Sequence, residues 1–97
     1  MQVDVSPQLI DKENIPNLSF PDGDVLPASS DRVKRIKDLK NANELGDLAQ
    51  YKVKILFVDD AGPKKVETTV WNTTNEGVVL KYGIEIPIRR VSKVVFP

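Results

Sequence analysis

The side chains best suited to hold a ligand are a basic cluster near the C-terminus and two aromatic residues. Arg89 and Arg90 are adjacent and Lys93 follows three positions later, so together they can present charged donors to a phosphate or a carboxylate. Trp71 and Tyr82 offer aromatic faces that can stack on a nucleic-acid base or anchor a peptide. These five residues form the predicted ligand-binding site.

Each group also has a purely structural interpretation. Trp71 can cover the core, because a small domain depends on burying its aromatic residues. Arg89 and Arg90 can form a solvated turn whose charges protect a strand edge. A further basic group on the predicted helix serves solubility as readily as binding, and it consists of Lys34, Arg35, Lys37 and Lys40.

The composition argues against catalysis. The 97 residues contain no cysteine and no histidine, which removes disulfides, thiolate and imidazole metal ligands, and the commonest general base near neutral pH. Asp59 and Asp60 lack the spaced ligand set of a calcium loop, and no glycine-rich phosphate loop occurs. We therefore predict a protein that is not an enzyme and has no cofactor and no metal.

Residues 1–30 differ in composition from the rest of the chain. They hold four of the seven prolines and carry a net charge of −4, whereas the remainder carries +4. Proline removes amide donors and favours extended backbone, so we expect a disordered or loosely packed acidic leader. One alternative is that Leu18 and Phe20 dock as a short peptide on this domain or on a partner. The charge difference also favours a leader that folds over the basic body and competes with a ligand.

A helix is predicted to follow the leader. The sequence SSD at 29–31 can cap its first amides. Apolar residues at three-residue spacing then form a narrow stripe, and later apolar residues at the same spacing no longer lie on its face. The regular helix is therefore expected to end near residues 40–41, with a further turn up to Gly46. The stripe consists of Val33, Ile36 and Leu39.

From residue 51 the apolar period changes to two, which is typical of strands. Turn residues divide this part into five short strands, and Pro87 is expected at a sheet edge because it lacks an amide donor. A flat sheet would leave its edges open, so we predict a mainly β fold over residues 31–97: one α-helix followed by a small five-stranded antiparallel barrel. The predicted strands lie near 51–58, 65–72, 78–82, 84–88 and 91–96.

The end of the chain resembles known small barrels. The sequence VVLKYGIEIPIRRVSKVVFP is similar to the strand, turn, strand, basic turn and short strand that close Sm-like barrels, including bacterial RNA chaperones, and SH3-like barrels more broadly. Across residues 32–97, RIKDLKNANELGDL, ETTVW and IPIRRV resemble a group of short bacterial proteins. The Sm-like resemblance implies RNA binding and assembly into rings through strand edges.

Two kinds of partner remain open from the sequence. Neutral net charge, short strand edges and the missing catalytic residues favour a non-enzymatic module that binds protein or peptide, for instance by strand addition. The basic body, the Arg89–Arg90 pair and the Sm-like pattern favour an RNA-binding barrel. No apolar run approaches the roughly 20 residues of a membrane span. We expect a cytoplasmic protein with no membrane partner, able to form homo-oligomers by pairing of strand edges.

Overall fold

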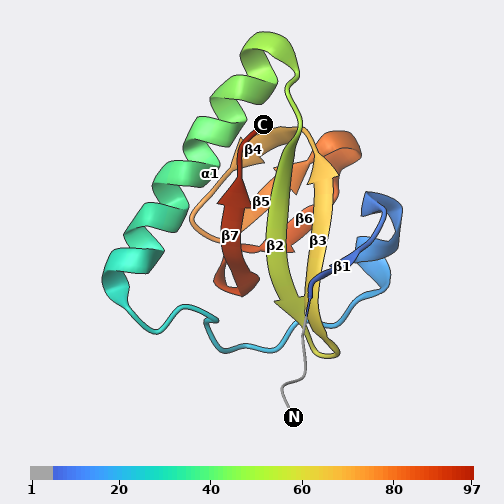
Figure 1. The fold of residues 1–97 in the computed structure, drawn as a ribbon, viewed down its shortest axis with the longest axis vertical. Helices are drawn as coiled ribbons and strands as arrows, with labels where there is room; N and C mark the ends of the chain where they lie inside the picture. Colours follow the sequence, from blue (N-terminus) through green and yellow to red (C-terminus); the bar gives the residue numbers. More distant parts are fainter. Residues whose placement is uncertain (1–5) are drawn as a thin grey trace.

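A computed structural model describes residues 6–97 and contains one α-helix and seven strands in two sheets (Figure 1). Of the described residues, 36% are helical and 35% are in strands. The fold is therefore mixed α/β, and the predicted mainly β class is not confirmed. One sheet has the order β1 (Gln8–Leu9), β3 (Gly62–Thr68), β2 (Val53–Asp59) and β7 (Val91–Val95). The other has the order β4 (Val70–Thr73), β5 (Gly77–Leu80) and β6 (Glu85–Pro87).

The strands follow the period-two pattern of the sequence. In β2 the inward side chains of Val53, Ile55 and Phe57 are all buried, and β2 pairs in antiparallel register with both β3 and β7. The predicted strand at 65–72 is divided at Thr69, where β3 leaves one sheet and β4 enters the other. Pro87 lies in β6, an edge strand, as its missing donor predicts.

The two sheets do not close into a barrel within residues 6–97. Instead, one α-helix and one 3₁₀ helix each contact strands of both sheets. The helix α1 (Ser29–Ala49) contacts β4 and β7, and the 3₁₀ helix η1 (Lys12–Asn17) contacts β3 and β6. Figure 1 shows α1 along one side of the sheets and the leader crossing past their ends before it enters α1. The shared core therefore depends on these covering elements as well as on the strands.

The helix is longer than predicted and buries a different face. It continues to Ala49 and ends where Gln50 takes the left-handed conformation (φ 54°) and donates its amide to the Gly46 carbonyl over 3.0 Å. Val33, part of the predicted stripe, is 70% exposed. The buried positions are spaced four, three and four residues apart and form one helical face. They are Arg35, Leu39, Ala42 and Gly46.

Gly46 allows α1 to approach β4 closely. A Cβ atom at this position would collide with the carbonyl oxygen of Val70 and lie 2.9 Å from the methyl carbon of Thr69. At an exposed position inside a helix, replacing glycine by alanine raises the free energy of unfolding by about 1 kcal/mol. Here we expect Gly46→Ala to lower the free energy of unfolding by about 1–3 kcal/mol, because the helix must move off the sheet. Urea unfolding measures this, with exposed Asn41→Ala as the control expected to change little; a stabilised Gly46→Ala would contradict the packing described.

The leader is packed against the sheets, which differs from the loosely packed or disordered segment expected. Ile15 is 1% exposed and belongs to the core, and the ring centroid of Phe20 lies 6.0 Å from that of Phe57. Leu18 and Phe20 dock on this domain, as the alternative interpretation proposed. Residues 1–5 of the predicted leader lie outside the described residues.

Candidate functional site

Two of the predicted site residues, Trp71 and Tyr82, lie together on the surface. Trp71 projects from β4 and Tyr82 from the 3₁₀ helix η2 (Lys81–Gly83) that joins β5 to β6. Their ring centroids are 5.9 Å apart and their planes make an angle of 69°, an edge-to-face arrangement. Trp71 is 48% exposed and Tyr82 is 68% exposed, so Trp71 does not take the core-covering role that was its structural alternative.

The backbone holds Tyr82 in an unusual conformation. Its φ is +68° and its ψ is +18°, in the left-handed region that bulky residues rarely occupy. The turn around it is fixed by the amide of Leu80, which donates to the Ile84 carbonyl over 2.6 Å, and by the amide of Lys81, which donates to the Thr69 carbonyl over 3.1 Å. Backbone strain of this kind concentrates at sites that bind ligands. Both aromatic side chains are therefore displayed by short, hydrogen-bonded elements.

Two lysines from distant parts of the chain flank the exposed tyrosine. The Nζ atoms of Lys12 and Lys81 lie 5.3 Å and 5.4 Å from the centroid of the Tyr82 ring. Such contacts are worth about 0.5–1 kcal/mol at exposed sites. Lys12 also pairs with Glu13, at 3.3 Å between Nζ and Oε1.

A hollow of about 550 Å³ adjoins the tryptophan, between the last turns of α1 and the start of β4. Asn43 of the helix donates from Nδ2 to the Trp71 carbonyl over 3.4 Å, which joins the two elements that form it. The hollow carries charges of both signs, and its lining consists of Gly46, Asp47, Gln50, Thr69, Trp71 and Lys81. We call this hollow, together with Tyr82 and Lys12, the aromatic surface.

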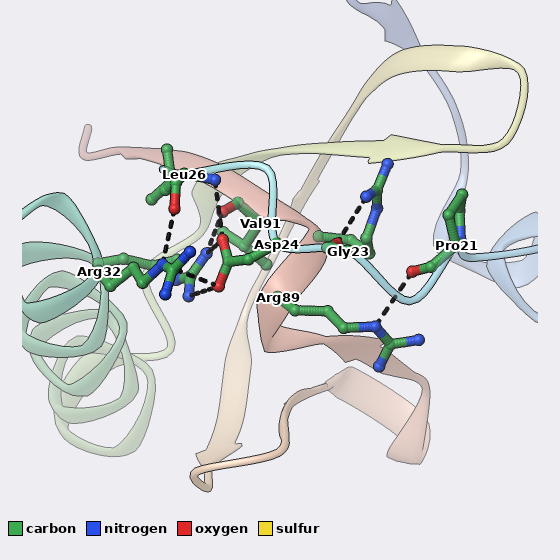
Figure 2. Close-up of polar contacts among 9 residues, drawn as sticks. Pro21, Gly23, Asp24, Leu26, Arg32, Arg89 and Val91 are labelled. Atoms are coloured by element: carbon green, nitrogen blue, oxygen red, sulfur yellow. Dashed lines mark hydrogen bonds and ion pairs between the residues drawn. The ribbon is translucent and has the colours of Figure 1, made fainter. Parts of the chain in front are cut away.

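The predicted basic pair has a different role from the aromatic surface. Arg89 and Arg90 lie in the 3₁₀ helix η3 (Ile88–Arg90), before β7. Arg89 donates from Nε to the Pro21 carbonyl over 3.1 Å, as Figure 2 shows. Arg90 donates from Nη1 to the Gly23 carbonyl over 2.7 Å and from Nε to the Val58 carbonyl over 2.9 Å. The bonds to Pro21 and Gly23 attach the leader to the body, so the arginines are not a purely solvated turn, while their ligand-binding role stays a prediction.

A partly buried ion pair continues the same attachment. Arg35, 6% exposed, donates from Nη1 and Nη2 to the two carboxylate oxygens of Asp24 over 2.9 Å and 2.8 Å, and from Nη1 to the Val91 carbonyl over 3.1 Å. The hydrogen bonds from Arg35 are the main cause that lowers the pKa of Asp24 to about 2, with further help from the amide of Leu26 and the charge of Arg32. Sequence reasoning placed Arg35 among the solubility charges. The signal that was missed is its position one turn before the buried Leu39.

Lys93, the fifth predicted site residue, lies in β7 and does not line the hollow beside Trp71. Its exposed side chain lines a hollow of about 210 Å³ between α1 and β7. Lys34 and Asp38 line the same hollow and pair with each other at 2.6 Å between Nζ and Oδ2. The predicted site is thus divided into an aromatic pair, an arginine pair that holds the leader, and a lysine beside α1.

The carboxylate of Asp59, in the acidic turn at residues 59–60, is engaged by hydrogen bonds within the chain. Oδ1 of Asp59 accepts hydrogen bonds over 3.0 Å from the amides of Ala61 and Gly62 and from Nζ of the buried Lys64. Burial raises the pKa of Asp59, but the bond from Lys64 and the two amides outweigh it, so the pKa is lowered.

Across residues 6–97 no group of three or more acidic side chains is arranged to hold a metal ion. Over the same range, no helix has the length and apolar character needed to cross a membrane.

Comparisons of this chain with models of protein families, with curated proteins and with solved structures found no match. The Sm-like and SH3-like resemblances therefore stay predictions.

Proposed function

We propose that this chain is a non-enzymatic binding module that holds a protein or peptide on its aromatic surface. The observation that carries this proposal is the contact between two exposed aromatic rings, Trp71 and Tyr82, beside a hollow. Tryptophan and tyrosine are enriched among the residues that dominate binding energy at protein interfaces. They supply a large contact area and lose little conformational entropy on binding.

The proposed fold behind this surface is an SH3-like barrel that is open along its sides. Two features support it. The chain passes from β3 to β4 with only Thr69 between them, and from β6 to β7 through the three residues of η3. The strand orders β7-β2-β3 and β4-β5-β6 then follow each other as they would around such a barrel.

A protein or peptide fits the aromatic surface better than RNA does. Arg89 and Arg90, the basis of the RNA hypothesis, donate to backbone carbonyls of the leader. The hollow is lined by the acidic Asp47 as well as by Lys81, and a carboxylate there repels the phosphates of a nucleic acid. Hydrogen-bonding groups of both signs suit the amides and carbonyls of an extended peptide.

One observation favours RNA as a second candidate. Lys12 and Lys81 flank Tyr82, and a stacking ring with adjacent cations is the usual platform for single-stranded nucleic acid. Titration with single-stranded RNA at low salt separates the candidates. We expect no binding up to high micromolar protein, whereas binding that weakens steeply as salt rises would favour RNA.

The experiment that tests the proposal is a selection of displayed peptides on the immobilised full chain. The counter-selection uses the Trp71→Ala/Tyr82→Ala double variant, so that only peptides requiring the aromatic surface are retained. Enrichment of a shared sequence pattern on the native chain is expected. No enrichment over the double variant would contradict the proposed surface.

Trp71→Ala is expected to weaken a selected peptide by about 2 kcal/mol or more, roughly 30-fold, because an interface aromatic of this kind carries much of the binding energy. Calorimetric titration measures the change. Val33→Ala is the matched control, since Val33 is an exposed apolar residue that belongs to α1 and is not part of the aromatic surface. Equal losses from the two variants would show that Trp71 has no special role.

A further inference from the structure

The leader occupies a groove on the body that we call the leader groove, formed by Arg35, Phe57, Asp60, Arg89 and Arg90. Figure 2 shows the polar half of this groove, where the loop from Pro21 to Leu26 passes between side chains of α1 and of the segment that leads into β7. The groove is distinct from the aromatic surface, because none of the five residues that form it lines the hollow beside Trp71.

The groove recognises both the side chains and the backbone of residues 15–24. Ile15 enters the core and Phe20 packs on Phe57. The carbonyl of Ser19 accepts from the amide of Asp60 over 2.9 Å, and the carbonyls of Pro21 and Gly23 accept from the two arginines of η3. Asp24 closes the segment in its bidentate pair with Arg35. Buried apolar side chains, a series of backbone carbonyls that accept hydrogen bonds, and one charged side chain together can specify a linear segment.

These contacts do not depend on the connection that joins the segment to its own body. Apart from Arg32, whose Nε lies 3.5 Å from Oδ2 of Asp24, the body residues that hold it are at position 35 or later. Residues 25–28 separate Asp24 from α1. The segment also leaves space in the groove, where a hollow of about 430 Å³ remains beside Leu18 and Phe20, against Glu85 of β6 and Arg89. A segment that is recognised through its own contacts and packed with space beside it can be supplied by another molecule.

We propose that the leader groove is an interaction surface for a second copy of this chain, which supplies its own residues 15–24 in exchange. A dimer formed in this way can keep the contacts that residues 15–24 make with the body, while contacts of the connection, such as the amide of Val25 with the Arg89 carbonyl over 2.9 Å, must rearrange. The tethered leader competes at an effective concentration in the millimolar range, so exchange becomes appreciable as the protein concentration approaches that range.

The test measures binding of a fluorescein-labelled peptide of residues 8–26, which stands for the leader of the second copy. The hosts are full-length chains with a weakened leader, Phe20→Ala and Asp24→Asn, and folding of each host is checked by circular dichroism. Fluorescence anisotropy is expected to show at least about tenfold tighter binding to these hosts than to the native chain, whose own leader competes. Light scattering of the native chain is expected to show dimers as the concentration rises toward the millimolar range.

Two altered peptides provide the specificity control without any change in the host. Asp24→Asn in the peptide should weaken binding to the Phe20→Ala host by about tenfold or more, because it removes the charged acceptor for buried Arg35. Asp22→Asn should change binding less than about twofold, since the carboxylate of Asp22 is fully exposed and lies 3.8 Å from Arg89. The proposal is wrong if folded hosts do not bind the peptide, if the two altered peptides bind alike, or if the native chain is monomeric throughout.

Discussion

Ile15→Ala is expected to lower the free energy of unfolding by about 3 kcal/mol, although Ile15 lies in a segment whose composition predicts disorder. The side chain is 1% exposed and belongs to the core cluster shared by both sheets. Truncation leaves a cavity between β3 and β6, where η1 covers the side of the molecule. Urea unfolding followed by circular dichroism measures the loss, which is large against the total stability of about 5–15 kcal/mol for a domain of this size.

The matched control is Leu9→Ala in the same leader. Leu9 is 63% exposed, so its truncation should change the free energy of unfolding by less than about 0.5 kcal/mol. If Ile15→Ala were as mild as Leu9→Ala, the leader would not be part of the folded core.

The second large effect is expected for Asp24→Ala, which should cost about 3 kcal/mol. Removal of the Asp24 carboxylate leaves the guanidinium of Arg35 buried without a counter-charge. The Nε of Arg35 is also buried and makes no hydrogen bond, so it does not offset the loss. The double variant Asp24→Ala/Arg35→Leu should recover part of the loss, because it removes the unpaired charge as well. If the losses in free energy of unfolding from the two single variants, Asp24→Ala and Arg35→Leu, simply added in the double variant, the two side chains would act independently.

The ion pair also gives a dependence on pH with a fixed sign. Folding lowers the pKa of Asp24 from 3.8 to about 2, so the folded state binds its proton less tightly than the unfolded state does. The contribution is complete above about pH 4 and is lost as the pH falls from 3.8 through 2. The native chain should therefore lose more stability over this interval than Asp24→Ala does. Asp22→Ala, which changes a fully exposed carboxylate, should retain the native pH dependence.

The strands could be predicted because their signal is local. Alternating apolar residues identify β2 through β7, and turn residues separate most of them. The divided strand at Thr69 was not predicted, since the alternation of side chains continues without interruption from Glu67 to Trp71 while the strand changes its sheet. The relation between two sheets depends on tertiary contacts that a period cannot express.

The end and the buried face of the helix were not predicted because polar and small residues form the contact. Arg35 is buried by virtue of its partner Asp24, eleven residues earlier, and Gly46 is buried because β4 approaches it. A search for apolar residues at helical spacing includes neither arginine nor glycine, so it misses both positions. The packed leader was missed for a similar reason, because Ile15 and Phe20 follow no period and the arginines of η3 hold backbone carbonyls, which carry no sequence signal.

The candidate site was predictable in part. Exposed aromatic residues are chemically conspicuous, so the sequence analysis named Trp71 and Tyr82 as candidates, and the structure brings their rings into contact. The flanking Lys12 was not found, because it comes from the leader.

The most direct test of the proposed function is a titration of the full chain with a selected peptide, followed by the fluorescence of Trp71, the only tryptophan of the chain. We predict that binding shifts the Trp71 emission, because the half-exposed indole becomes covered. We also predict that Tyr82→Ala weakens the same titration by about tenfold or more. An unshifted emission together with equal affinity for the Tyr82→Ala chain would contradict the assignment of binding to the aromatic surface.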